Sequence, residues 1–224
     1  MPTERLRVLV AGDSTSIGAA EALFTAGNGT VDVLSIGRDA CPLVSTSGVR
    51  WGSNELDVSE CPRIESDWAS YLDRFHPDVV LLVASLMEQS DQRYVGDDSW
   101  HEPGDPAYVA HHDDFMTQLQ AVVGTSIPIA VTDGPPIAAG NFSGSEMARP
   151  ERVAAWNAVL TSWAATWPNV HVLPYAQGIA TLEGAEPGSQ RPDGVHLSPQ
   201  GAQQVAATVI LPALRDLAIA PPAT

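Results

Sequence analysis

Residues 8–18 read VLVAGDSTSIG, an apolar run that passes through Gly12 and Asp13 into Ser14 and then into a helix-like stretch. A phosphate loop is excluded because it requires a lysine and the chain contains none. A dinucleotide fingerprint is excluded because Ser14 stands where its second glycine belongs. The Gly-x-Ser-x-Gly elbow also fails, since Ser16 replaces its last glycine. Two interpretations remain: an ordinary turn with a serine cap, or a nucleophilic serine at a helix N-terminus, where free N–H groups stabilise an oxyanion.

The rest of the chain alternates between two kinds of apolar pattern. Near-continuous apolar runs predict buried parallel strands at 6–11, 31–36, 78–84, 127–132 and 170–174. Helical patterns lie between them at 15–26, 65–75, 107–123, 150–166 and 198–217. This alternation predicts an α/β fold, a three-layer α/β/α sandwich with a five-stranded parallel sheet. Without an internal repeat or a linker, residues 1–224 are expected to form a single domain.

Three connections are longer than usual, at 37–64, 85–106 and 174–197. Each is expected to be structureless and to follow the carboxyl end of a strand, where open α/β sheets form their ligand crevice. Ser14 follows the first strand at that same edge. The long connections therefore predict a functional site around the start of the first helix.

The composition of the chain excludes several classes of function. The net charge is −16 and all eleven basic residues are arginine, so we expect no nucleic-acid partner. No apolar run approaches the length of a membrane span, so we expect no direct membrane insertion. The first strand begins almost at once, which leaves no room for a signal peptide. We therefore expect either a cytoplasmic protein or a domain of a longer exported chain.

The two cysteines leave two alternatives open. Cys41 and Cys61 lie in the same irregular stretch and each precedes a proline. They are either two buried free thiols or a disulfide that closes a loop of roughly twenty residues. A disulfide would favour an oxidising compartment.

The stretch RPDGVHLSPQGA at 191–202 places Asp193 and His196 three residues apart, just before the last helix. Alone, either residue is a common turn residue. With Ser14 at the other terminus they supply what nucleophilic catalysis needs: a base in reach of the serine and an acid that orients the base. We therefore expect Ser14, Asp193 and His196 to form a catalytic triad.

On these motifs the sequence resembles the SGNH hydrolase family, also called GDSL-type esterases, over essentially its whole length. The resemblance implies the flavodoxin-like fold of that family, with Ser14 as nucleophile, His196 as base and Asp193 as the acid. It also implies an oxyanion hole formed by the N–H groups of Ser14 and Gly37. The family usually adds an asparagine after the third strand of its sheet, but this chain reads Ala84-Ser85 and has no asparagine there. Ser85 is the expected replacement donor, with Gln89 or a two-donor hole as alternatives.

The loop sequences DVVLLVASLMEQSDQ, DDSWHEPGDPAYVAHHDDF and RPDGVHLSPQGA are similar to actinobacterial SGNH domains, which are often attached to membrane-bound acyltransferases that modify cell-surface glycans. The paired cysteines also fit that group. The resemblance implies a serine esterase that removes short acyl groups, above all acetyl, from hydroxylated substrates such as carbohydrates. The alternatives are an O-acyltransferase domain acting on cell-surface glycans, with a membrane acyltransferase as partner, and a non-catalytic glycan-binding domain. An exported or membrane-attached chain would place the domain outside the cytoplasm.

Other polar residues are interpreted as structural. Asp13 is expected to bind backbone amides near its turn. His111 and His112 lie beside Asp113 and Asp114. Consecutive helical residues diverge, so these four predict a solvated helix start and not a metal site. We expect no metal and no cofactor.

Overall fold

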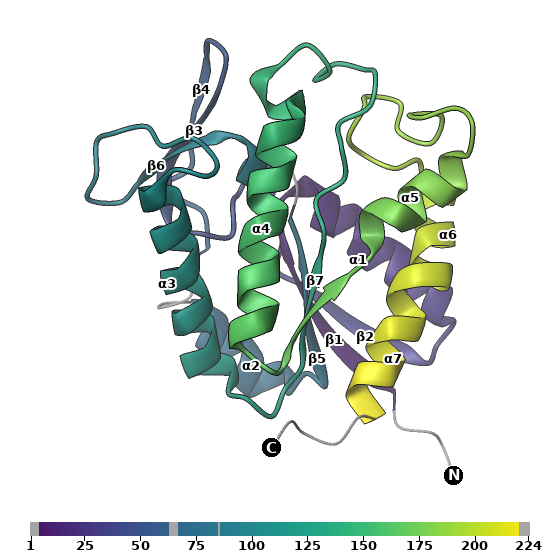
Figure 1. The fold of residues 1–224 in the computed structure, drawn as a ribbon. Coiled ribbons are helices and arrows are strands. Elements are labelled where there is room, and N and C mark those ends of the chain that lie inside the picture. Colours follow the sequence, from purple (N-terminus) through teal and green to yellow (C-terminus); the bar gives the residue numbers. More distant parts are fainter. Residues whose placement is uncertain (1–4, 63–66, 85, 220–224) are drawn as a thin grey trace.

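The computed structural model describes residues 5–62, 67–84 and 86–219. Its main sheet has five parallel strands in the order β2-β1-β5-β7-β8 (Figure 1). These strands are β1 (Leu6–Gly12), β2 (Val31–Ser35), β5 (Val79–Val83), β7 (Ile129–Thr132) and β8 (Val170–Leu173). The predicted five-stranded parallel sheet is confirmed, and its order is that of flavodoxin-like folds.

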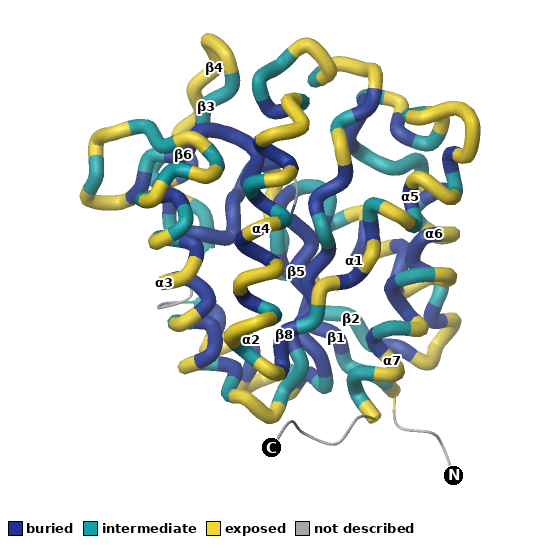
Figure 2. Tube along the Cα trace, in the orientation of Figure 1, coloured by how far each residue is buried: buried dark blue, intermediate teal, exposed yellow. Residues whose placement is uncertain are grey.

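Helices cover both faces of this sheet. They are α1 (Ser14–Gly27), α2 (Ala69–Phe75), α3 (Pro106–Val123), α4 (Pro150–Thr166), α5 (Tyr175–Glu183), α6 (Pro199–Val205) and α7 (Leu211–Ile219). Leu9 and Ala11 of β1 belong to the core with α2, α3 and α4, whereas Val8 and Val10 belong to the core with α1, α5, α6 and α7. Successive strand residues thus face opposite layers, and the central strands β5 and β7 are buried at every position (Figure 2).

The expectation that the three long connections are structureless was wrong. The connections after β2 and β5 pair with each other in a second, antiparallel sheet of order β4-β3-β6, made of β3 (Thr46–Trp51), β4 (Asn54–Asp57) and β6 (Asp91–Tyr94). The third connection contains α5. A search for apolar patterns does not find the strands of the small sheet, because they are short and mostly polar. Their sequences are TSGVRW, NELD and DQRY.

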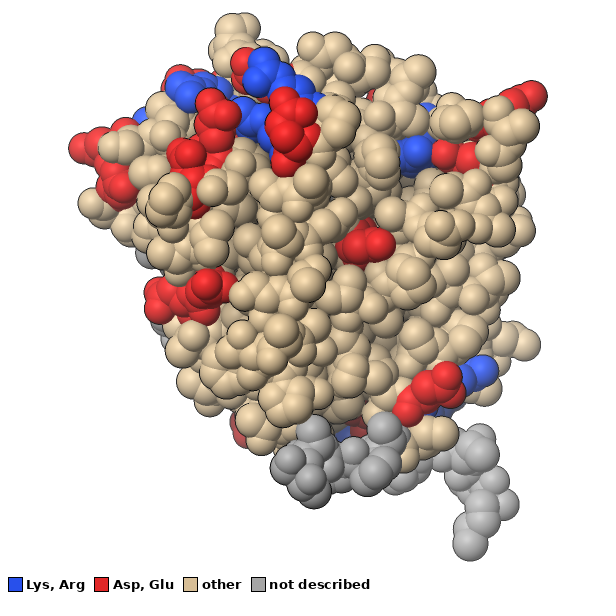
Figure 3. Space-filling model, viewed as in Figure 1, with Lys and Arg blue, Asp and Glu red and all other residues tan. Residues whose placement is uncertain are grey.

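Ion pairs fasten the small sheet to α4. Asp91 of β6 lies 2.7 Å from the guanidinium of Arg50 on β3 and 2.7 Å from that of Arg152 on α4. Arg149, at the cap of α4, pairs with Glu146 at 3.6 Å. Charged side chains of both signs accordingly gather at the end of the molecule that carries this sheet (Figure 3). Two arginines on one buried carboxylate fix the small sheet relative to the main fold.

The last helical stretch departs from a regular helix. The prediction was one helix over 198–217, but α6 passes through a π-helical turn, Ala206–Ile210, into α7. Pro212 lies in the first turn of α7 and lacks the N–H that would continue the ladder. The start of the predicted helix 65–75 lies outside the described residues, and α2 supplies the rest.

Cys41 and Cys61 form a disulfide, so the alternative of two free thiols was wrong. The bond joins the connection between β2 and β3, which contains Gly37, to the segment after β4. Among the described residues, no helix is long and apolar enough to cross a membrane.

Candidate active site

Ser14 is the first residue of α1, directly after β1. Gly12 has a φ of 138°, and a β-carbon there would lie 1.8 Å from the carbonyl oxygen of Val83 on β5. Only glycine therefore lets the end of β1 pass so close to its neighbour. Asp13 caps the helix, because its Oδ1 accepts a hydrogen bond from the Thr15 N–H at 2.9 Å. As expected, Asp13 binds backbone, and Ser14 projects from a fixed helix N-terminus.

His196 lies against Ser14 although 182 positions separate them in the sequence. The His196 Nε2 atom is 2.7 Å from the Ser14 Oγ, and the His196 Nδ1 is 2.6 Å from the Asp193 Oδ2. Because Asp193 accepts a hydrogen bond from Nδ1, Nε2 is left to accept the serine proton. The structure thus brings together the three residues that the sequence predicts to act in concert.

The Asp193 carboxylate also organises its own loop. Its Oδ1 accepts hydrogen bonds from the main-chain N–H groups of Val195 at 2.9 Å and His196 at 2.8 Å. Partial burial would raise the pKa of Asp193, but the hydrogen bonds from the His196 ring and from these two amides outweigh burial and lower it. Asp193 therefore stays ionised at neutral pH beside the imidazole.

Gly37 lies beside the start of α1. The N–H of the next residue, Arg38, donates to the Gly12 carbonyl at 3.1 Å. A β-carbon on Gly37 would lie 1.9 Å from the Ser16 Oγ, which is buried and donates to the Asp13 carbonyl at 2.7 Å. The chain can approach α1 this closely only because residue 37 has no side chain.

The remaining predicted donor is not placed. Ser85 lies outside the described residues, so its part in an oxyanion hole stays a prediction. Gln89, the alternative, is fully buried, and neither atom of its amide has a hydrogen-bond partner within the described part of the chain. Its Nε2 is 3.2 Å from the position of a β-carbon on Gly134, which follows β7. Its amide thus points toward the segment after β7.

Two buried ionisable residues next to these segments were missed by sequence reasoning. Glu88 follows β5 and is fully buried. Arg191 makes two hydrogen bonds of 2.9 Å to the Glu183 carboxylate and one of 2.6 Å to the Pro136 carbonyl. This pair fixes the start of the loop that carries Asp193. The only signal for Arg191 in the sequence is its place two positions before that aspartate.

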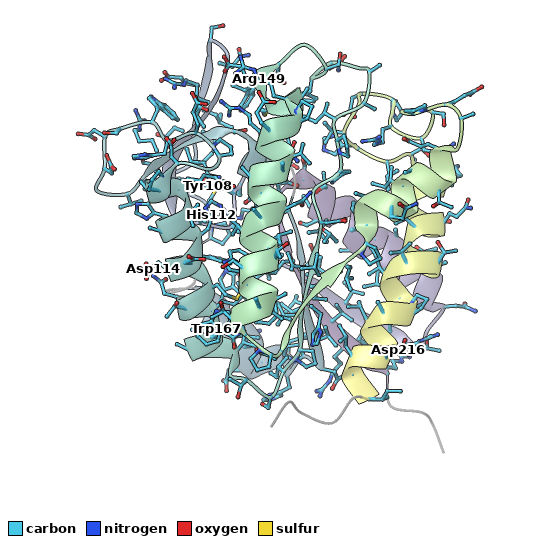
Figure 4. All side chains as sticks on the ribbon, viewed as in Figure 1. Tyr108, His112, Asp114, Arg149, Trp167 and Asp216 are labelled. Atoms are coloured by element: carbon cyan, nitrogen blue, oxygen red, sulfur yellow. A yellow bond between two sulfur atoms is a disulfide. The ribbon has the colours of Figure 1, made fainter. Side chains whose placement is uncertain are left out.

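The expectation of a solvated helix start at 111–114 was wrong for His112. This residue is fully buried within α3, donates from Nδ1 to the Tyr108 carbonyl at 2.8 Å and packs on the Tyr108 ring with centroids 4.0 Å apart (Figure 4). Burial lowers the pKa of His112 to about 3. Because positions i and i+4 share a helix face, His112 continues the apolar stripe that Tyr108 begins. Within the described ranges, no group of three or more His, Cys, Asp or Glu residues is arranged to hold a metal.

Comparison with known proteins gives one family match. The family model described as "SGNH domain (fused to AT3 domains)" matches residues 2–210. No curated protein matches the sequence.

Solved structures show the same fold at low sequence identity. A putative acylhydrolase from Bacteroides fragilis has a TM-score of 0.64 at 17% identity, covering 96% of this chain and 91% of that one. The periplasmic domain of a lipopolysaccharide acetyltransferase from Salmonella ser. Paratyphi A has a TM-score of 0.59 at 12% identity, covering 90% and 80%. An acetylxylan esterase from Geobacillus stearothermophilus has a TM-score of 0.56 at 13% identity, covering 97% and 96%. At such identities the likeness establishes the fold alone.

Proposed function

The chain belongs to the family of SGNH domains that occur fused to AT3 domains, and we propose that it is a serine esterase that removes an acetyl group from a hydroxylated substrate such as a carbohydrate. The observation that carries the proposal is the hydrogen-bonded series from the Ser14 Oγ through the His196 ring to the Asp193 carboxylate. A serine that only caps a helix does not require an imidazole within hydrogen-bond distance of its hydroxyl. A serine nucleophile does, because a base must accept its proton.

In the first half of the reaction, the Ser14 Oγ attacks the ester carbonyl carbon and its proton passes to the His196 Nε2. The Asp193 carboxylate stabilises the imidazolium that forms. The carbonyl oxygen becomes an oxyanion, which accepts hydrogen bonds from the N–H groups of Ser14 and Gly37. The intermediate then collapses: the ester C–O bond breaks, the leaving alcohol takes the proton from His196, and Ser14 carries the acetyl group.

In the second half, water attacks the acetyl-enzyme. His196 takes a proton from the water, a second tetrahedral oxyanion forms in the same place, and the Ser14 oxygen leaves with that proton. Acetate is released and the hydroxyl of Ser14 is restored. The His196 side chain is 40% exposed, so water reaches the base directly from solvent.

Hydrolysis of p-nitrophenyl acetate by the wild type and by Ser14→Ala tests the assignment. We expect Ser14→Ala to lose at least about 10³-fold in kcat, as removal of a nucleophile does in other serine enzymes. The matched control is Ser162→Ala, an exposed serine on α4, which should keep the wild-type rate. Mass spectrometry of the intact wild type after rapid quenching should show one added acetyl group. Equal rates in the wild type and Ser14→Ala would refute the nucleophile assignment.

A second candidate, O-acetyl transfer to a cell-surface glycan, is favoured by the family description, which joins such domains to AT3 domains, and by the acetyltransferase domain among the structural neighbours. A sugar hydroxyl then replaces water in the second half-reaction. With p-nitrophenyl acetate as donor, the fraction of acetyl transferred should saturate with glycan concentration if the protein has an acceptor site. If the transferred fraction rises linearly with glycan concentration, the glycan competes with water for the acetyl-enzyme without being bound at an acceptor site. Glycan binding with no acetyl-enzyme would instead point to a non-catalytic binding domain.

We propose that this single SGNH domain works outside the cytoplasm next to a membrane acyltransferase. The Cys41–Cys61 disulfide supports this placement, because such bonds persist in oxidising compartments. Co-purification of the native protein with an acyltransferase in membrane fractions, and labelling of the domain by impermeant reagents on intact cells, would test it. Recovery of the domain only from the cytosol, with both thiols reduced, would contradict it.

A further inference from the structure

We propose that Glu88, buried in the turn after β5, is a positioning residue that joins the segments carrying Ser14 and Gly37, and that a negative charge on it slows the reaction. The inference rests on the proposed esterase function for its effect on rate. It does not rest on that function for the state of the Glu88 carboxyl group, which can be measured without turnover.

Glu88 lies in the short 3₁₀ turn Met87–Gln89 that follows β5, and none of its surface is exposed. Its Oε1 accepts a hydrogen bond of 2.7 Å from the Leu43 N–H. Leu43 lies in the connection that contains Gly37, two residues after the disulfide-bonded Cys41. The Glu88 side chain therefore ties the turn after β5 to the segment that supplies the proposed Gly37 donor.

The same turn also reaches the nucleophile. The Met87 N–H lies 3.4 Å from the Asp13 Oδ2, on the carboxylate whose other oxygen caps α1 beside Ser14. On the far side, the Tyr108 hydroxyl of α3 donates to the Glu88 carbonyl at 2.7 Å. Three segments of the chain thus make hydrogen bonds to this turn. A displacement of Glu88 would therefore also displace Asp13 and Leu43.

The surroundings of Glu88 favour its neutral form. Within the described residues, the titratable groups that interact with it are Asp13 at the start of α1, Tyr94 on β6 and Tyr108 on α3. Arg152 of α4 reaches the carbonyl of the next residue, Gln89. Within the described part of the chain, its Oε2 has no hydrogen-bond partner. Burial first, and then the Asp13 charge, raise the pKa of Glu88 to about 8 against the opposing effect of the Leu43 N–H.

The guanidinium of Arg152 does not form an ion pair with Glu88. It lies 2.7 Å from the Asp91 carboxylate and donates to the Gln89 carbonyl at 3.1 Å. The cation that binds this turn is therefore already paired with another carboxylate. Ionised Glu88 would be a second negative charge close to Asp13, which caps the helix that begins at Ser14.

Ionisation of Glu88 releases its proton to solvent and leaves a charge that opposes the growing negative charge on the substrate oxygen. For a unit charge roughly 10 Å away at an effective dielectric constant of about 20, Coulomb's law gives a slowing on the order of ten-fold. The pH profile of kcat/KM should therefore fall on its alkaline side, and Glu88 is responsible for that fall.

Glu88→Gln separates the charge from the packing, because glutamine has the same shape, keeps an oxygen for the Leu43 N–H and does not ionise. We measure p-nitrophenyl acetate hydrolysis from pH 5 to 10 at the isosbestic wavelength of p-nitrophenol, and subtract the rate with Ser14→Ala protein. The wild type should lose on the order of ten-fold in kcat/KM above about pH 8. Glu88→Gln should keep the wild-type rate at pH 7 and show no alkaline loss. Glu21→Gln, an exposed glutamate on α1, is the matched control and should keep the alkaline loss.

Two results would overturn the proposal: a wild-type profile that stays flat up to pH 10, or an alkaline loss that persists in Glu88→Gln. A third variant, Glu88→Leu, removes the acceptor for Leu43 and should lower the rate at every pH. A wild-type rate in Glu88→Leu would mean that Glu88 positions nothing.

A direct titration protects the test against a variant that fails to fold. Ser14→Ala protein labelled with ¹³C at the glutamate carboxyl groups should show one resonance that titrates near pH 8, well above the rest. If every glutamate resonance titrates below pH 6, Glu88 is not held neutral and the proposal is wrong, whatever the esterase assays give. If Glu88 titrates near pH 8 in a protein whose wild type has no esterase activity, the proposed function is wrong and the claimed effect on rate is refuted with it.

Discussion

Replacement of Gly37 by alanine should remove one oxyanion donor without touching the proposed nucleophile, base or acid. The new methyl group would lie 1.9 Å from the Ser16 Oγ, against an ordinary contact of at least 3.4 Å, so one of the two must move by about 1.5 Å. Ser16 cannot yield easily, because it is fully buried and its hydroxyl donates to the Asp13 carbonyl at 2.7 Å. Residue 37 must therefore move, and its N–H moves with it.

A displacement of that size would take the N–H out of hydrogen-bond range of the oxyanion in the proposed reaction. We expect Gly37→Ala to lower kcat for p-nitrophenyl acetate by about 10²-fold, the usual effect of losing one donor. Overpacking should also reduce the free energy of unfolding by about 1–3 kcal/mol. Steady-state kinetics and urea denaturation measure the two effects separately.

A second substitution provides the control. Ser16→Ala removes the oxygen that blocks the methyl group and leaves contacts of 3.1 Å to the Gly12 carbonyl and 3.2 Å to the β-carbon of residue 16. The double variant Gly37→Ala/Ser16→Ala should therefore recover much of the lost rate. A wild-type kcat in Gly37→Ala alone would show that the Gly37 N–H does not stabilise the oxyanion. Failure of Ser16→Ala to restore any rate would refute the steric argument.

Three further substitutions test the supports of the site. Removing the Cys41–Cys61 disulfide as a double serine variant should destabilise the fold by about 3 kcal/mol, because the bond closes a loop of 20 positions; an unchanged urea midpoint would contradict this. Arg191→Met leaves the buried Glu183 carboxylate without its partner and should cost about 3–5 kcal/mol, and Glu183→Leu added to it should restore part of that loss in thermal denaturation. His112 has a pKa of about 3 in the folded protein and an ordinary value of 6.5 when unfolded, so the unfolded chain takes up the proton first as pH falls. Its contribution to stability is complete above pH 6.5 and is lost at about 1.4 kcal/mol per pH unit below it. His112→Phe should flatten that slope in urea titrations at pH 7 and pH 5, and an equal slope in both proteins would refute it.

The main sheet and the site segments were predictable because their signals are local. The central strands β5 and β7 are buried at every position and so appear as almost wholly apolar runs, VVLLV and IAVT. Asp193 and His196 lie within one turn, and Ser14 directly follows a strand. Parallel topology then brings the ends of these segments to one edge, without any knowledge of long-range contacts.

The small sheet could not be predicted, because its pairing joins segments far apart in the sequence. Arg50 of β3 pairs with Asp91 of β6, 41 positions later. The β4 strand, NELD, is exposed along its whole length and has no apolar face. The burial of Glu88 could not be predicted either, because a glutamate in a polar stretch is usually exposed to solvent. Only the fold shows that three other segments cover its turn.

The small sheet contributes to the packing that positions the segment of Ser14 relative to the loop that carries His196. Val49 points from the inner face of β3 into a cluster that also contains Leu86, Met87 and Val195. Met87 is the residue whose N–H lies against Asp13, next to Ser14, and Val195 immediately precedes His196. One apolar cluster therefore packs against both the turn behind Ser14 and the loop that carries His196. Because close-packed side chains transmit small displacements, a change of packing in this cluster should alter the 2.7 Å separation between Ser14 and His196.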